Sequence, residues 1–135
     1  MTMSTAARML ETYPGEPLLS ASQLAECLDA CFDCAQCCTA CADACLAEEM
    51  VADLRACIRF NQDCADVCAM TGALLTRQTQ PNVQLLRQAL ELCAAACAAC
   101  AEECEKHAGH HEHCKVCAES CRRCEKACRD LLAAL

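Results

Sequence analysis

Cysteine recurs along most of this chain with a step that alternates between three and four residues. In the first series, from Cys27 to Cys45, the successive steps are 4, 3, 4, 3 and 4 residues. An α-helix turns about 100° per residue, so these steps return every side chain to one narrow stripe. A β-strand would scatter the same positions over both of its faces. Three later stretches repeat the pattern, and the sequence therefore predicts four long helices, each with a cysteine stripe. The stripe positions are Cys27, Cys31, Cys34, Cys38, Cys41 and Cys45; Cys57, Cys64 and Cys68; Cys93, Cys97, Cys100 and Cys104; and Cys114, Cys117, Cys121, Cys124 and Cys128.

Two residues depart from the pattern. Asn61 occupies the step between Cys57 and Cys64 where a cysteine is missing, so its amide is expected inside the protein. A buried amide needs a partner, which is either a metal ion at its oxygen or a neighbouring thiol or backbone carbonyl. Cys37 lies beside the first stripe, and its role stays open.

The ends of the helices follow from turn residues and from the phase of the stripes. Pro14, Gly15 and Pro17 mark one break, the segment 72–81 another, and Gly109 a third. Cys57 lies 12 residues after Cys45, which is roughly 120° out of register with a continuing helix and predicts a turn near 47–51. We expect a short helix near 4–12 and longer helices near 20–48, 50–76, 81–108 and 110–134.

These elements predict an all-α fold, an antiparallel up-down four-helix bundle with a cysteine-lined core and a short N-terminal helix. Short connections make consecutive helices antiparallel neighbours. The segment 1–17 would carry the short helix, and 18–135 would form the bundle domain. Charged residues between the cysteines, Glu103 among them, are expected on the solvent face.

Composition limits the function. The 135 residues include 19 cysteines but only three aromatic residues, and glycine and proline together number six. An odd number of cysteines excludes complete internal disulfide pairing, and the segment 1–17 has no recognisable export signal. We therefore expect reduced thiols and a cytoplasmic protein. A net charge of −8 argues against nucleic acid and anionic membranes as partners, and no apolar run approaches a membrane span.

Thiols in such numbers would fill a bundle core poorly, because cysteine is smaller than leucine and cavities cost stability. Disulfides fit the spacing badly: residues three or four apart on a helix have Cβ atoms about 5–6 Å apart, whereas a disulfide needs about 3.5–4.5 Å. A metal ion between two sulfurs spans about 4.6 Å if metal–sulfur bonds are about 2.3 Å long. The stripes therefore favour metal bridges.

Charge favours Cu(I) among the metals that bind thiolate. One Cu(I) per bridging thiolate is neutral, so many ions per chain could fill a dry core, whereas each Zn(Cys)₄ centre carries −2. Two alternatives stay open, a metallothionein-like zinc buffer and an iron–sulfur electron carrier. The chain lacks the short cysteine loops that usually hold iron–sulfur clusters. No catalytic group stands apart from the cysteines and histidines, so no enzymatic activity is expected.

The two ends of the predicted bundle differ. Cys45, Met50, Cys104 and Cys114 would share one end, and extending two stripes there adds His107 and either His110 or His111. The opposite end is expected to be an apolar plug. We expect copper to enter and leave at the His/Met end, because a neutral imidazole binds Cu(I) and can release it. Whether Met50 and His113 bind metal stays open. The residues expected at the plug are Leu24, Leu75, Val83, Leu86, Leu90 and Leu131.

The repeated C-x₃-C-x₂-C spacing and the histidine group before the last helix resemble the bacterial copper storage protein family, in its cytosolic branch. The resemblance covers 23–135. It implies a four-helix bundle that holds many Cu(I) ions, a homotetramer, a copper entrance lined by histidines rather than methionines, and a core asparagine that contacts copper. A copper chaperone or a small-thiol donor would supply the ions.

Overall fold

The protein is described here by a computed structural model, which covers residues 3–135. A short helix α1 (Thr5–Glu11) precedes four long helices, α2 (Ala21–Leu46), α3 (Arg55–Thr76), α4 (Val83–Glu105) and α5 (Glu112–Ala134), and a 3₁₀ turn η1 (Val51–Leu54) leads into α3. Residues 3–135 contain no strand. The all-α prediction is confirmed, and each observed helix lies within or close to its expected range.

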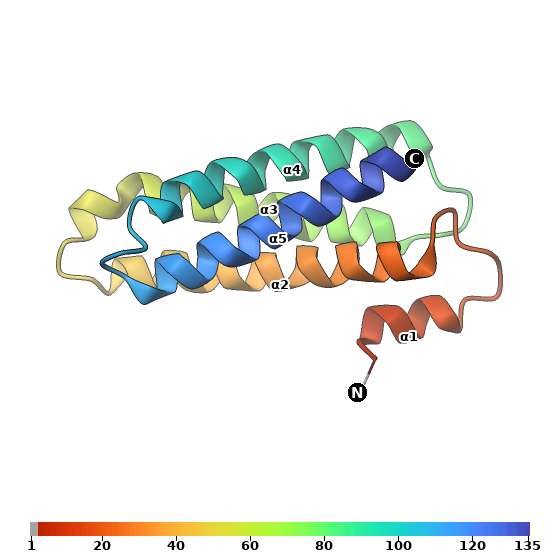
Figure 1. Cartoon of the computed structure of the whole chain (residues 1–135), viewed down its shortest axis with the longest axis horizontal. Coiled ribbons are helices and arrows are strands. Elements are labelled where there is room, and N and C mark those ends of the chain that lie inside the picture. The colour runs from red at the N-terminus through yellow and green to blue at the C-terminus, as the bar shows by residue number, and fades with distance from the viewer. Residues whose placement is uncertain (1–2) are drawn as a thin grey trace.

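The four long helices form an antiparallel bundle in which α2 packs against α3 and α5, and α4 packs against the same two helices (Figure 1). The turns α2–α3 and α4–α5 therefore meet at one end of the bundle, and the α3–α4 connection meets the C-terminus at the other (Figure 1). Helix α1 lies outside the bundle against α2. The up-down topology is the one that the sequence predicts.

The turn near 47–51 forms where the phase of the stripes requires it, but Met50 lies in this turn and not in the helix expected near 50–76. The α-helical part of α3 starts only at Arg55, so Met50 is not on its stripe. Its side chain is 52% exposed, while Leu54 of the 3₁₀ turn is fully buried. The α-helix therefore begins later than the expected start near residue 50, because a tighter 3₁₀ turn precedes it and changes the phase.

The end of the bundle next to the α3–α4 connection is an apolar plug, as expected. Five of the six predicted plug residues are buried, but Val83 is 37% exposed because it opens α4 at the rim. A cavity bordered by Leu24, Leu75 and Leu86 has a volume of about 10 Å³, at the lower limit of what one water molecule occupies. The five buried leucines are Leu24, Leu75, Leu86, Leu90 and Leu131.

Thr71 separates this plug from the cysteines on α3. It is fully buried, and its hydroxyl donates hydrogen bonds to the carbonyls of Val67 (2.8 Å) and Ala89 (3.5 Å). The polar oxygen is thus satisfied by two backbone groups, one of them on α4. Of the two buried polar side chains on α3, Thr71 thus bonds to the backbone, and only Asn61 contacts the thiols.

Ion pairs on the outside of the bundle join α5 to its neighbours. Arg123 contacts Glu26 (2.7 Å) and Asp33 (2.8 Å) on α2, and Arg122 contacts Glu105 (2.8 Å) at the end of α4. All are partly exposed, and such pairs are worth about 0–1 kcal/mol each. They confirm a solvated outer face, and the stability of the bundle comes mainly from its core.

Helix α4 corrects one expectation about apolar stretches. An 18-residue window within its 23 residues reaches a mean hydropathy of 1.3, which is long and apolar enough for a membrane span by length and composition alone. Alanine and cysteine supply much of this hydropathy, and the α4 cysteines are buried against the other helices. A core helix passes the same test, so α4 is weak evidence for a membrane.

The capping of α4 gives a stability prediction. The side-chain oxygen of Asn82 accepts a hydrogen bond from the Leu85 N–H (3.1 Å), whereas Ser20 at the start of α2 makes no such bond. Asn82→Ala should lower the free energy of unfolding of the reduced, metal-free protein by about 1 kcal/mol. Ser20→Ala is the control and should change it by less than half as much. Urea unfolding followed by circular dichroism measures both, and equal effects would contradict this role of Asn82.

Candidate metal centre

The cysteine stripes of all four long helices face one another along the axis of the bundle. The 18 stripe cysteines are at most 2% exposed, and all 19 cysteines are free thiols. Cys37 alone is half-buried, beside the α2 stripe as the sequence indicates. The structure thus brings together the thiols that the spacing selects.

Neighbouring sulfur atoms are too far apart for disulfides. The closest pairs, Cys38–Cys121 and Cys68–Cys97, have Sγ atoms 3.6 Å apart, and the Cys93–Cys124 pair is at 4.0 Å. A disulfide bond is about 2.05 Å long. Sulfurs bound to one metal ion at about 2.3 Å lie about 3.8 Å apart in a tetrahedron and about 4.6 Å apart in a linear unit. The spacing therefore fits thiolates that share metal ions.

Groups of four thiols overlap along the core. In each group the sulfurs lie within 4.8 Å of one another, and Cys34, Cys38, Cys121 and Cys124 each belong to two groups. A sulfur common to two groups can bridge two metal ions. These shared sulfurs link four of the groups into one row of bridging ligands, and a further group follows it toward the histidines. The groups include Cys31, Cys93, Cys124 and Cys128; Cys34, Cys68, Cys97 and Cys124; Cys34, Cys38, Cys64 and Cys121; Cys38, Cys100, Cys117 and Cys121; and Cys41, Cys45, Cys57 and Cys114.

The thiols also share protons. Hydrogen bonding to Cys121 lowers the pKa of Cys34, whereas hydrogen bonding with Cys100 raises the pKa of Cys38. At the histidine end, burial raises the pKa of Cys45 to about 11 and that of Cys114 to about 12. A thiolate formed in the core is thus stabilised by neighbours that keep their protons. All thiols can lose their protons together only if cations replace them.

Asn61 lies at the centre of a group of thiols. Its Oδ1 accepts hydrogen bonds from the thiols of Cys100 (2.9 Å) and Cys117 (3.1 Å), and its Nδ2 donates to the sulfur of Cys57 (3.7 Å). Without metal the amide is therefore satisfied by thiols, one of the two arrangements expected from the sequence. Its oxygen also lies within reach of an ion bound by the same sulfurs.

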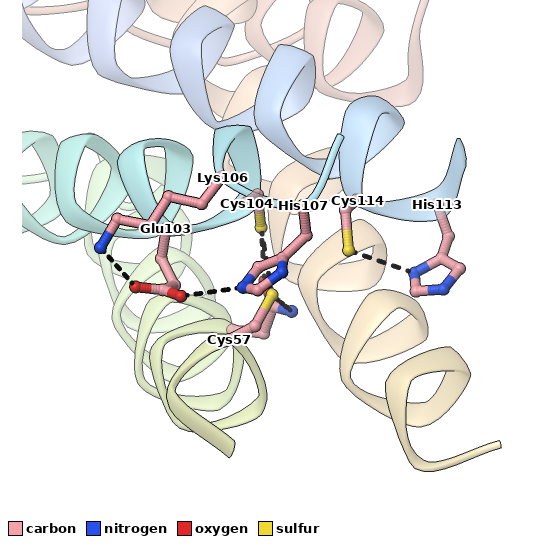
Figure 2. Close-up of polar contacts among 8 residues, drawn as sticks. Cys57, Glu103, Cys104, Lys106, His107, His113 and Cys114 are labelled. Carbon is pink, nitrogen blue, oxygen red and sulfur yellow. Dashed lines mark hydrogen bonds and ion pairs between the residues drawn. The ribbon is translucent and has the colours of Figure 1, made fainter. Parts of the chain in front are cut away.

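The end of the bundle formed by the turns α2–α3 and α4–α5 carries three histidines near the cysteines. His113 Nδ1 lies 3.6 Å from Cys114 Sγ (Figure 2), and it also lies 3.5 Å from Cys41 Sγ. The ring of His111 stacks on that of His113 with centroids 5.5 Å apart. Burial disfavours the charged form of His113, but hydrogen bonds with Cys41 and Glu48 outweigh it and raise its pKa.

His107 lies at the same end of the bundle, beside Glu103 (Figure 2). Its Nε2 lies 3.1 Å from a carboxylate oxygen of Glu103, and Lys106 contacts the other oxygen at 3.1 Å. Glu103 is only 8% exposed, so its expected place on the solvent face is wrong. Burial raises the pKa of Glu103, but hydrogen bonds from Lys106 and His107 outweigh this effect and lower it.

The structure decides among the other histidines. His111 is 9% exposed, whereas His110 is exposed at the turn, so of the two only His111 is packed into this end of the bundle. His113 also lies against the cysteines, although it is one residue, about 100°, away from Cys114 on α5 and therefore off the stripe. Only the packing of α5 on α2 brings His113 to Cys41, and the stripe gives no signal for that contact.

Comparison with known proteins relates this chain to copper-binding and cysteine-rich proteins. Residues 20–133 match the sequence model of the copper storage protein family. The chain is similar to Ccsp, a copper storage protein from Streptomyces lividans solved with 10 copper equivalents, at 53% identity and a TM-score of 0.94 over 97% of this chain and all of that one. The Cu(I)-bound copper storage protein Csp3 from Bacillus subtilis is 38% identical with a TM-score of 0.70, over 78% of this chain and 94% of that one. An uncharacterised cysteine-rich protein, YhjQ of Bacillus subtilis, is 38% identical over 107 residues, 79% of this chain and 94% of that protein.

The exposure of Cys37 predicts a single fast-reacting thiol. A hydrogen bond with Cys117 lowers its pKa, which increases its thiolate fraction, while the stripe cysteines are buried. Brief treatment of the reduced, metal-free protein with iodoacetamide at neutral pH should modify Cys37 first, as mapped by mass spectrometry. Cys37→Ser should remove this fast phase. Rapid modification of many stripe cysteines in the folded protein would contradict the buried arrangement.

Proposed function

Because this chain belongs to the copper storage protein family, we propose that it stores Cu(I), holding many ions on the thiolates inside its bundle and exchanging them through the histidine end. The observation that carries this proposal is the overlapping set of buried thiols that runs along the core. Storage is a binding function, and it needs no catalytic group.

Charge neutrality supports copper over zinc in such a core. Each Cu(I) that replaces one thiol proton leaves the core uncharged, so loading can continue along the whole row. Each separate tetrathiolate zinc centre adds a charge of −2, which is costly to bury in an apolar interior. Closed zinc sites also need four sulfurs each, whereas Cys34 and Cys121 are shared between groups. The geometry therefore suits a bridged Cu(I) row best.

The ends of the bundle give copper transfer a direction. Leucines close one end and leave a cavity of only about 10 Å³. At the other end His113 lies beside Cys41 and Cys114, and His111 stacks on His113. An imidazole can take a Cu(I) ion and pass it to a thiolate a few ångströms away. Each thiol gives up its proton as the ion binds, so the ion moves into the core without leaving charge behind.

The site residues form two groups in this proposal. The stripe cysteines hold the stored ions, with Asn61 between them. His107, His111 and His113 bind ions in transit. His110 and Met50 are exposed, and we assign them no metal-binding role.

The surroundings of the protein are inferred from the family. A relative from Streptomyces lividans, 57% identical, is described as a cytosolic copper storage protein, and we infer the same compartment for this chain. The homotetramer, and a copper chaperone or small-thiol donor as the source of copper, remain predictions.

Anaerobic metal titration tests the stored ion. The reduced protein should bind Cu(I) up to a ratio near one ion per thiolate, and it should release about one proton per ion, because each Cu(I) replaces a thiol proton. Near-ultraviolet thiolate–copper absorption follows the binding. Zinc is the comparison, since 19 thiolates could fill at most four separate tetrathiolate sites. Saturation by only a few Cu(I) ions would contradict storage, and four tightly bound zinc ions with weak Cu(I) binding would indicate a zinc buffer.

Paired histidine variants test the entrance. His113→Ala should slow Cu(I) uptake from a chromophoric chelator about tenfold, because it removes the imidazole beside Cys41 and Cys114, while the total number of ions bound stays within about one of the original. His110→Ala is the control, since this exposed histidine lies on the same turn. Stopped-flow absorption measures both rates. Equal rates for the two variants would place the entrance elsewhere.

A further inference from the structure

A single glutamate lies against two histidines at the histidine end of the bundle, where the turns α2–α3 and α4–α5 meet. Glu48 is in the turn after α2, where its backbone N–H donates to the carbonyl of Cys45 (3.2 Å). One of its carboxylate oxygens, Oε2, lies 3.0 Å from His113 Nε2 and 2.7 Å from His111 Nδ1. The turn between α2 and α3 therefore contacts the N-terminal turn of α5 through this carboxylate.

The contact with Glu48 determines which nitrogen of His113 is free. An ionised carboxylate can only accept hydrogen bonds, so the Nε2 atom that faces it carries a proton. In the neutral ring the other nitrogen, Nδ1, is then the one with the lone pair. That nitrogen faces Cys41 and Cys114, at 3.5 and 3.6 Å. The lone pair is thus directed at the thiols of the core.

We propose that Glu48 is a positioning residue for copper uptake. It holds His113 in the tautomer and orientation that present Nδ1 to an ion moving from the protein surface to Cys41 and Cys114. The proposal rests on the proposed function, because it assigns Glu48 a role in the uptake of the same cargo. Carboxylates that accept a hydrogen bond from a metal-binding histidine fix its tautomer and increase its basicity in many metal sites.

His111 strengthens this arrangement. Its Nδ1 meets the same oxygen of Glu48, and its ring stacks on that of His113 at an angle of 23°. Both rings are therefore oriented by one side chain from another part of the chain. At the same end of the bundle, the carboxylate of Glu103 contacts the ring of His107. Because His107 stays in place, loss of Glu48 should slow uptake without stopping it.

The neighbouring glutamate provides a matched control. Glu49 follows Glu48 in the same turn and is exposed, and within residues 3–135 its carboxylate makes no hydrogen bond or ion pair. Glu48→Ala and Glu49→Ala remove the same number of atoms and the same charge. Only Glu48→Ala removes the contact with His113 and His111.

The experiment combines nitrogen NMR of the reduced, metal-free protein with Cu(I) uptake from a chromophoric chelator. At a pH above the raised pKa of His113, where its ring is neutral, the ring nitrogens in the original protein should show the tautomer protonated at Nε2. Glu48→Ala should give a mixture of tautomers and about tenfold slower uptake, with an unchanged number of ions bound. Glu48→Gln, which keeps the length of the side chain but is a weaker acceptor, should show a smaller slowing. Glu49→Ala should match the original protein in both measurements.

The outcomes separate this inference from the proposed function. If the original protein binds many Cu(I) ions but Glu48→Ala keeps both its uptake rate and its His113 tautomer, the role of Glu48 is overturned and storage stands. An equal slowing in Glu49→Ala would also overturn it, because net charge alone would then explain the effect. If the original protein binds no Cu(I), the proposed function itself fails. Circular dichroism of each variant identifies any loss of fold, and if Glu48→Ala fails to fold, Glu48→Gln decides: an unchanged rate and tautomer would overturn the role.

Discussion

The structure depends on the convergence of thiols from four helices in a core that contains little else. Sulfur atoms 3.6–4.0 Å apart form only weak hydrogen bonds with one another, and a thiol fills less space than the side chains that usually pack a bundle. Large leucines are concentrated at one end, where they stabilise the fold and close it. The rest of the core forgoes apolar packing for ligands. This arrangement is consistent with a core that metal ions complete.

The two ends of the bundle differ because the turns there differ. At the plug, the α3–α4 connection lies over leucines. At the other end, the turns α2–α3 and α4–α5 bring carboxylates and imidazoles together over the last cysteines. Glu48 and Glu103 each hold a histidine, and they come from different helix ends. The histidine end therefore has oriented imidazoles from two parts of the chain, an arrangement that suits the transfer of ions between ligands.

Periodicity predicts the fold and most of the candidate site, because one stripe of cysteine per helix leaves a single way to bury all of them. The turn near 47–51 follows from phase alone. The positions of individual side chains at the histidine end could not be predicted from the periodicity. Met50 precedes a 3₁₀ turn for which the sequence contains no glycine or proline as a signal. Glu103 is buried where it pairs with Lys106 and His107. His113 reaches Cys41 only through the packing of α5 on α2. Each of these depends on contacts between elements, which a pattern within one helix cannot encode.

The central claim is that a continuous row of bridging thiolates runs along the core and that Cu(I) fills it. A crystal structure of the copper-loaded protein, with anomalous scattering measured at the copper edge, tests it most directly. The account predicts a row of copper ions inside the bundle, from the leucine plug to the histidines, each bonded to cysteine sulfurs that are shared with the next ion. Copper confined to the surface or to the histidine opening, with the core thiols protonated or joined as disulfides, would contradict it.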